Sequence, residues 1–114
     1  MANHADYLAS AIEMMVLKML SEEKMYGYQI IKLVNERTDG EFKWKEGSLY
    51  PVLHKLASCG QLQCEWVEVP GYNRPRRYYS ITPAGLESLQ TRLKDWKSYS
   101  ANVNAVMLLQ GGVK

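Results

Sequence analysis

The sequence predicts a mainly α-helical fold of the α+β class, with one small β-hairpin and a long C-terminal helix. Apolar residues recur at intervals of three and four in four segments, which is the pattern of amphipathic helices. Two short runs typical of strands flank a turn sequence of Pro, Gly and Asn, which indicates a hairpin. The 114 residues, 46% of them hydrophobic, suffice for one modest core. We expect residues 1–82 to form the main domain and residues 83–114 a terminal helix and tail.

The first two helices are predicted from the spacing of their apolar residues. One stripe predicts a helix from about residue 7 to 21, and its members are Leu8, Ile12, Met15, Val16, Met19 and Leu20. A second helix follows Tyr26-Gly27-Tyr28 and is expected to stop at the glycine of Thr38-Asp39-Gly40. Residues 41–47 are aromatic and charged, and we expect a brief strand or a connector there.

The third helix is expected over residues 48–60. Ser48 is placed to cap its start, Pro51 falls in its first turn, and Gly60 ends it. One face is apolar and consists of Leu49, Val52, Leu53 and Leu56. The outer face, with its flanks, carries Ser48, Tyr50, Pro51, His54 and Lys55. Because most of these outer residues are short or neutral, the helix can approach a ligand surface closely.

The hairpin is expected to pair residues 62–69 with residues 76–82 across a six-residue loop, Pro70 to Pro75. If the loop closes with Val69 opposite Arg76, the cross-strand pairs follow by alternation. Those pairs are Trp66 with Tyr79, Cys64 with Ile81, and Glu68 with Arg77. This register makes the base of the hairpin apolar and its tip charged.

The last helix begins at Thr82-Pro83, a capping residue followed by a proline at the first helical position. Its seam alternates in steps of three and four through Leu86, Leu89, Leu93, Trp96, Ser100, Val103 and Met107. A helix of about 25 residues is about 37 Å long, which exceeds what so small a domain can cover. We therefore expect a second copy of the chain to cover part of the seam, in a homodimer.

Charge and cysteine usage exclude several classes of function. The net charge is only +2, but it divides into −3 for residues 1–41, +3 for residues 42–82 and +2 for residues 83–114. The absence of a long apolar run or a secretion signal predicts a cytoplasmic protein. Cys59 and Cys64 lie far from any histidine spacing that suits zinc, so reduced structural cysteines and no metal are expected. The sequence shows no catalytic constellation and predicts neither an enzyme nor a bound cofactor.

Three helices followed by a hairpin with a basic tip make a winged helix-turn-helix. A helix of this kind fits the major groove of double-stranded DNA, and arginines on the wing reach phosphates or a narrow minor groove. The candidate DNA contacts are Ser48, Tyr50, Pro51, His54 and Lys55 on the third helix, Lys43 and Lys45 before it, and Arg74, Arg76 and Arg77 on the wing. Arg77 is more readily explained by a structural pairing with Glu68. A winged-helix module that binds an acidic protein surface through Trp44, Tyr72 and the basic tip remains the alternative.

Three sequence blocks resemble the hallmark motifs of PadR-family transcriptional regulators. They are Met25-Tyr-Gly-Tyr-Gln-Ile-Ile31, Glu46-Gly-Ser-Leu-Tyr-Pro-Val-Leu-His-Lys-Leu56 with Gly60 following, and Arg74-Pro-Arg-Arg-Tyr-Tyr-Ser-Ile-Thr-Pro-Ala-Gly85. The resemblance spans roughly residues 8–100. It implies a dimeric winged-helix repressor that acts on a pseudo-palindromic operator and often responds to a small aromatic or toxic compound.

The single C-terminal helix is similar to that of the short subgroup of the family. In that subgroup paired helices build the dimer, and in some members a planar apolar effector binds at the interface beside a tryptophan, which Trp96 matches. The residues expected to form the ligand site or the dimer interface are Leu8, Ile12, Met15, Leu89, Leu93, Trp96, Val103 and Met107.

Overall fold

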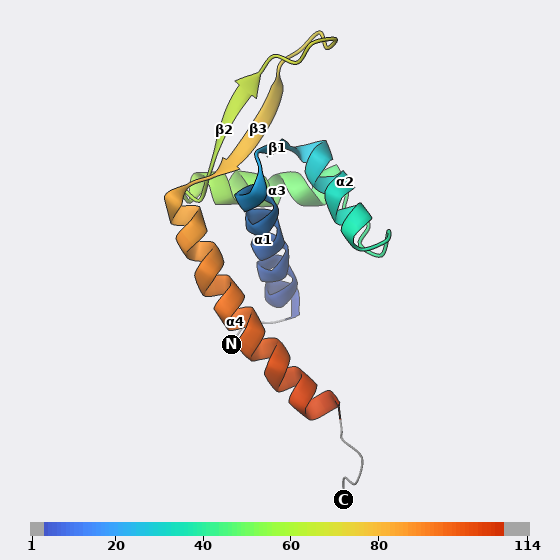
Figure 1. Ribbon diagram of the computed structural model, residues 1–114, viewed down its shortest axis with the longest axis vertical. Coiled ribbons are helices and arrows are strands. Elements are labelled where there is room, and N and C mark those ends of the chain that lie inside the picture. The colour runs from blue at the N-terminus through green and yellow to red at the C-terminus, as the bar shows by residue number, and fades with distance from the viewer. Residues whose placement is uncertain (1–3, 109–114) are drawn as a thin grey trace, which may run out of the picture.

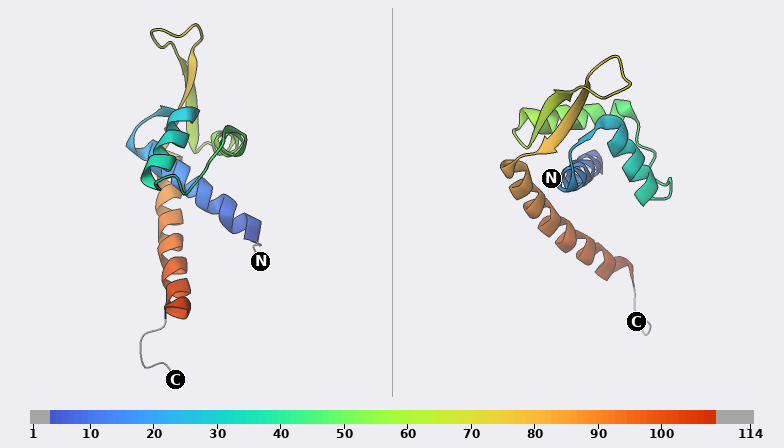
Figure 2. Two further views of the ribbon diagram at one scale, coloured as in Figure 1. Left: turned by 90° about the vertical axis from the view of Figure 1, so that its right-hand side faces the viewer. Right: turned by 45° about the horizontal axis from the view of Figure 1, so that its top comes forward.

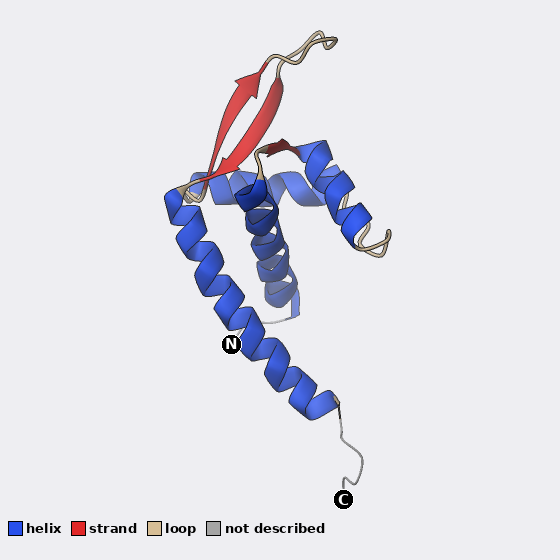
Figure 3. Ribbon diagram, in the orientation of Figure 1, coloured by secondary structure: helices blue, strands red, loops and turns tan. Residues whose placement is uncertain are grey.

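The computed structural model describes the backbone of residues 4–108 and the side chains of residues 9–108. Its elements are α1 (His4–Glu22), β1 (Met25–Tyr26), α2 (Gly27–Arg37), α3 (Glu46–Ser58), β2 (Leu62–Val67), β3 (Arg76–Ile81) and α4 (Pro83–Met107). Within residues 4–108, four helices and one three-stranded antiparallel sheet confirm the predicted α+β class. Figure 1 shows the β2–β3 hairpin and the free end of α4 at opposite ends of the molecule, and Figure 3 shows that the strands are confined to one end.

The hydrophobic core lies where α1, α2 and α3 meet. Its most deeply buried side chains are Val16, Leu17, Ile30, Leu49, Leu53 and Leu56. Three of these come from the predicted inner face of the third helix, and Val52 on the same face is half-buried. Each such side chain stabilises the fold by about 1.5–3 kcal/mol through burial. The core therefore fixes the orientation of α3 and leaves its opposite face in solvent.

The start of α3 differs from the sequence-based prediction. The helix begins at Glu46 with Lys45 as its capping residue, so Ser48 lies inside the first turn and does not cap it. Pro51 consequently lies in the helix interior instead of the first turn, and the carbonyl of Gly47 lacks the donor that a non-proline residue would supply. The predicted stop is confirmed, because Gly60 has a φ of +77°, a left-handed value that suits glycine. Residues 41–45 contain no strand and form a connector.

The sheet has the order β1-β3-β2, and the hairpin register differs from the predicted one by two residues. Cys64 pairs with Tyr79 and Trp66 with Arg77, whereas Trp66 was expected opposite Tyr79 and Glu68 opposite Arg77. The loop therefore spans residues 68–75 and is two residues longer than expected. A short strand that the sequence analysis did not predict, β1, pairs with β3 through Met25–Tyr79 and Tyr26–Tyr78. This strand ties the base of the hairpin to the start of α2.

Helix α4 begins as predicted and leaves the body of the protein halfway along its length. The Thr82 hydroxyl accepts a hydrogen bond from the Gly85 amide at 3.0 Å, and Pro83 occupies the first helical position. The first half packs against α1, where Leu89 is buried and Leu93 is half-buried. The C-terminal end of the helix extends away from the rest of the described chain, as both views of Figure 2 show. Leu89 therefore belongs to the chain's own core and not to a surface available to a partner.

Candidate nucleic-acid interface

The outer face of α3 is open to solvent over its whole length. Ser48, Tyr50, Pro51, His54 and Lys55 are all exposed, as the sequence predicts. Gly47, on the same exposed face, has no side chain, and the space beside it is open, since a Cβ atom there would meet no atom within 4 Å. Gly47, Ser48 and Pro51 thus give the exposed face a stretch of small residues, on a rigid helix that the core supports. Such a surface can enter a groove without steric obstruction.

Tyr50 fastens the start of α3 to the start of α2. Its ring lies against Gly27, where a Cβ atom would stand only 2.7 Å from the Tyr50 hydroxyl oxygen. Glycine at this position therefore permits a close approach, and a larger residue would require the Tyr50 ring to shift. Because 43% of the Tyr50 residue surface remains exposed, the side chain both supports α3 and reaches solvent.

Lys55 is held by an acidic residue that the sequence analysis did not single out. Its ammonium donates a hydrogen bond to the carboxylate of Glu13 at 2.7 Å, and Arg92 contacts the other carboxylate oxygen at 2.9 Å. Burial of Glu13 opposes its ionisation, but the hydrogen bonds and charges of Lys55 and Arg92 outweigh that effect and lower the pKa of the carboxyl. The triad joins α1, α3 and α4. Lys55 is therefore turned toward the helical body, which makes it a weaker candidate for DNA contact than its neighbours on α3.

The arginines of the wing differ in their surroundings. Arg74, at the loop tip, is exposed and makes no side-chain hydrogen bond or ion pair within the described residues. The guanidinium of Arg76 lies between two rings, with its Cζ atom 4.2 Å from the ring centre of Tyr26 and 3.8 Å from that of Tyr72. Cation–π contacts of this kind use the electron-rich ring faces and leave the N–H groups of the guanidinium able to donate.

The Arg77 side chain makes its contacts on the face of the sheet opposite to Arg76. Its Nε and Nη2 atoms donate to the sulfur of Cys64 at 3.3 and 3.2 Å, and its guanidinium lies near the rings of Trp66 and Tyr79. The hydrogen bonds to Cys64 raise the pKa of Arg77. The expected structural role of Arg77 thus has physical support, although its partner is Cys64 and not Glu68, because the register is shifted by two residues.

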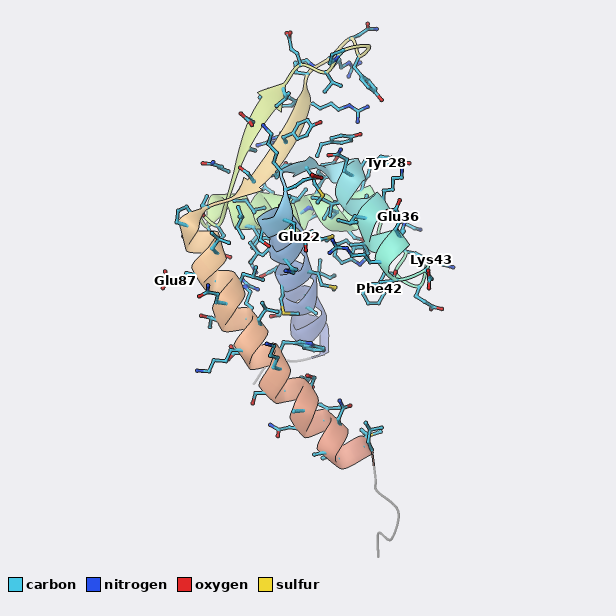
Figure 4. The ribbon with its side chains drawn as sticks, in the orientation of Figure 1. Glu22, Tyr28, Glu36, Phe42, Lys43 and Glu87 are labelled. Atoms are coloured by element: carbon cyan, nitrogen blue, oxygen red, sulfur yellow. The ribbon has the colours of Figure 1, made fainter. Side chains whose placement is uncertain are left out.

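The wing and the starts of α2 and α3 enclose one open concavity of about 450 Å³. Its lining consists of Tyr26, Tyr28, Glu46, Tyr50, Trp66, Arg76, Arg77 and Tyr79. The structure therefore brings Tyr50 of the third helix and the wing arginines together, as a shared DNA surface requires. Lys43 is not part of this group; Figure 4 shows it beside Phe42, at the end of α2 away from Tyr28. Lys45 is exposed at the start of α3.

A second surface surrounds Trp96 on α4. One hollow of about 280 Å³ lies between Trp96, Tyr99 and Ser10 of α1, and a second of about 240 Å³ lies between Trp96, Met15 and Phe42. Met15 and Leu93 line the second hollow, whereas Ile12 is half-buried and packs against the hydrophobic core. Trp96, Val103 and Met107 remain 46%, 39% and 68% exposed, as an interface requires. Leu8, predicted for the same surface, lies outside the residues whose side chains are described.

The described residues contain neither a metal-binding cluster nor a membrane-spanning helix. No group of three or more His, Cys, Asp or Glu side chains in this part of the chain is arranged to hold a metal ion. No helix within the described residues is both long enough and apolar enough to cross a membrane.

Comparison with known proteins decides the family. Residues 16–91 match the model of the transcriptional regulator PadR-like family, which covers more than half of the chain. The chain belongs to the PadR-like family of transcriptional regulators. Such regulators bind DNA, are generally dimeric and are not enzymes. Membership favours DNA binding over the protein-interaction alternative.

Individual PadR-like relatives agree with the family assignment. The transcriptional regulator Rv3488 of Mycobacterium tuberculosis is 31% identical over 84 residues, which are 74% of each chain. The structure of a transcriptional regulator from Clostridium thermocellum has a TM-score of 0.79 at 27% identity and covers 88% of this chain and 96% of its own. A PadR family transcription regulator from Clostridium difficile R20291 has a TM-score of 0.71 at 28% identity, covering 86% and 98%.

Some residues of this PadR-like site were not recognised from the sequence. Tyr28 and Trp66 are 57% and 68% exposed and both line the concavity, although Trp66 was expected at the apolar base of the hairpin. The sequence did contain a pattern that places Glu13 on the buried face of α1. Glu13 lies three and four residues before the core residues Val16 and Leu17, a spacing that puts all three on one face of a helix. An acidic residue at such a position requires a partner.

Proposed function

We propose that this PadR-like protein is a cytoplasmic homodimeric repressor that binds a pseudo-palindromic operator in double-stranded DNA. On this proposal α3 enters the major groove, and the wing contacts the phosphates or the minor groove beside it. The observation that carries the proposal is the shared concavity, in which Tyr50 of α3 faces the same space as Arg76 of the wing. A dimer places two such surfaces on half-sites about one helical turn apart.

The predicted DNA contacts divide into two groups in this proposal. Direct contacts come from Ser48, Tyr50, Pro51 and His54 on α3, Arg74 and Arg76 on the wing, and the flanking Lys43 and Lys45. Lys55 and Arg77 are exposed but are weaker candidates for direct contact, because each already donates to a partner in the protein, Lys55 to Glu13 and Arg77 to Cys64.

Arg74→Ala should weaken binding to an operator duplex and to a scrambled duplex by similar factors. Arg74 carries a free positive charge at the wing tip, and a phosphate contact does not depend on base sequence. The slope of log affinity against log salt concentration should become less steep by about one. Fluorescence anisotropy on the promoter DNA beside the protein's own gene measures both quantities.

The matched control is Lys97→Ala, which removes one positive charge from the exposed surface of α4, away from the wing. We expect its affinity and salt slope to remain close to those of the wild type. Equal losses in the two variants would mean that net charge alone determines binding, and the contact of the wing tip would have to be abandoned.

The exposed half of α4 supports the proposed homodimer. Val106 and Met107 are 71% and 68% exposed in the single chain, and Trp96 on the same helix is 46% exposed. Contiguous apolar surface of this kind marks an interaction site, and a two-fold dimer places the same patch of each copy against the other. We propose that α1 and α4 of two copies form this interface.

The hollows beside Trp96 support the proposal of a planar aromatic effector that relieves repression. One is walled by apolar side chains including Met14, Met15 and Leu93. The other lies under the Trp96 and Tyr99 rings, whose centres are 6.3 Å apart. Aromatic and flexible thioether walls suit a flat apolar molecule.

Trp96→Ala should weaken the dimer by about tenfold or more, because a large aromatic side chain at the centre of an interface carries much of its energy. It should also abolish saturable quenching of tryptophan fluorescence by acridine orange. Sedimentation velocity and a fluorescence titration provide the measurements. Trp66→Ala, which removes an exposed tryptophan from the wing, is the control. A Trp96→Ala protein as tightly dimeric as the wild type, together with no quenching in the wild type, would reduce Trp96 to a packed side chain.

A further inference from the structure

The wing loop is linked to the body of the protein by a stack of three side chains. The guanidinium of Arg76 lies between the ring of Tyr72, which belongs to the loop, and the ring of Tyr26, which belongs to β1. Tyr26 is itself fixed, because it pairs with Tyr78 in the sheet and meets the ring of that residue edge to face at 5.3 Å. The stack therefore runs from an exposed loop to a residue held in the sheet.

Within the described residues, the backbone of the loop has little other support. Its one turn hydrogen bond joins the Tyr72 amide to the Val69 carbonyl at 3.1 Å, and Gly71 adopts a left-handed φ of +88°. That hydrogen bond closes the turn on itself and does not connect it to the helices. The direction in which the loop points, and with it the position of Arg74, therefore depends on the Tyr72–Arg76–Tyr26 stack.

We propose that Tyr72 and Tyr26 are positioning residues, which hold the wing loop so that Arg74 faces a DNA phosphate. This inference rests on the proposed function. A loop already ordered before binding loses less conformational freedom on meeting DNA, and the affinity rises accordingly. Tyr72 acts through its ring face, so its hydroxyl is not needed, and it acts mainly by placing Arg74, so most of its effect is lost when Arg74 is absent.

Tyr72 is the residue to change, because 57% of its surface is exposed and its loss leaves the core intact. Tyr72→Ala should lower duplex affinity by about fivefold, the equivalent of one cation–π contact. Tyr72→Phe keeps the ring and should bind as the wild type does. In the Arg74→Ala background, Tyr72→Ala should cause a much smaller loss than in the wild type, which a double-mutant cycle by fluorescence anisotropy measures.

A second measurement monitors the mobility of the wing loop in the absence of DNA. Amide hydrogen exchange of residues 70–74 should accelerate in Tyr72→Ala and remain unchanged in Tyr72→Phe, with an unchanged melting temperature in both. A direct contact between the Tyr72 hydroxyl and DNA would weaken Tyr72→Phe as well and would make the losses from Tyr72→Ala and Arg74→Ala additive. Either result would overturn the positioning role.

Different results would contradict the DNA-binding function and the positioning role of Tyr72. If the wild-type protein bound no duplex, the proposed function would fail and this inference with it. If the wild type bound duplex and Arg74→Ala weakened it, while Tyr72→Ala bound and exchanged like the wild type, only the positioning role would be lost.

Discussion

Gly85→Ala should destabilise the folded protein by about 3 kcal/mol, at the upper end of what overpacking a protein interior costs. A methyl group at Gly85 would overlap the carbonyl oxygen of Gln61 and would stand 2.7 Å from Cγ1 of Ile81. The Gln61 carbonyl accepts a hydrogen bond from the Thr82 amide at 3.1 Å, so it cannot withdraw freely. Urea unfolding followed by circular dichroism, at one protein concentration, measures the loss.

Gly47→Ala is the matched control, because nothing lies within 4 Å of the added methyl group and the residue is on the exposed face of α3. Replacing a helical glycine with alanine should leave stability unchanged or raise it by about 0.5–1 kcal/mol. A Gly85→Ala protein as stable as the Gly47→Ala protein would show that the start of α4 is not tightly packed against Gln61, which precedes β2, and Ile81 of β3.

Glu13→Gln should destabilise the protein by about 1–2 kcal/mol at neutral pH, because Lys55 and Arg92 lose the charge that they share. Lys55 is largely exposed and keeps its hydration, so we expect a smaller loss than for a fully buried pair. Glu87→Gln, an exposed change on the outer side of α4 in Figure 4, should have almost no effect.

The loss of folding stability in Glu13→Gln should become smaller as the pH falls. Lys55 and Arg92 hold the pKa of Glu13 below its usual range, whereas in the unfolded chain it takes the ordinary value of about 4.3. The stabilisation by the carboxylate is therefore complete above the ordinary pKa and is lost as the pH falls through the lowered pKa of the folded state. Urea midpoints of the two proteins should converge between neutral and acidic pH. A difference that stayed constant across this range would exclude the charge of Glu13 as its cause.

The sequence predicts the helices of this fold well because their ends carry local signals. The Thr82 cap, Pro83 and the left-handed Gly60 all act within a few residues of their own position. The start of α3 was misplaced because Ser48 is a good capping residue by type, yet the preceding residues Glu46 and Gly47 also adopt helical conformation.

The hairpin register was wrong for a physical reason. Side chains alternate with a period of two along a strand, so a shift of two residues leaves every side chain on the same face of the sheet. Cys64 and Tyr79 share a face in both the expected and the observed register. What distinguishes the registers is long-range: the buried Leu62 lies opposite Ile81, and Met25 of β1 lies opposite Tyr79. Neither contact is visible in a local pattern.

The sequence predicted which elements form the candidate site, but not which residues its charged side chains contact. The sequence indicates that α3 and the wing form one surface, and the structure brings Tyr50 and Arg76 to the same concavity. It could not indicate that Lys55 meets Glu13, because 42 residues separate them. The stacking of Arg76 on Tyr26 likewise depends on β1, a strand of two residues that is too short to produce a pattern.

The salt dependence of duplex binding by the wild-type protein tests the central claim most directly. We expect tight binding to a two-fold symmetric duplex from the promoter of its own gene and weaker binding to a scrambled duplex. Log affinity should fall linearly with log salt concentration, with a slope of about −0.9 for each phosphate that the protein neutralises. Absence of duplex binding, or an affinity that does not change between low and high salt, would contradict the assignment of α3 and the wing as a DNA-binding surface.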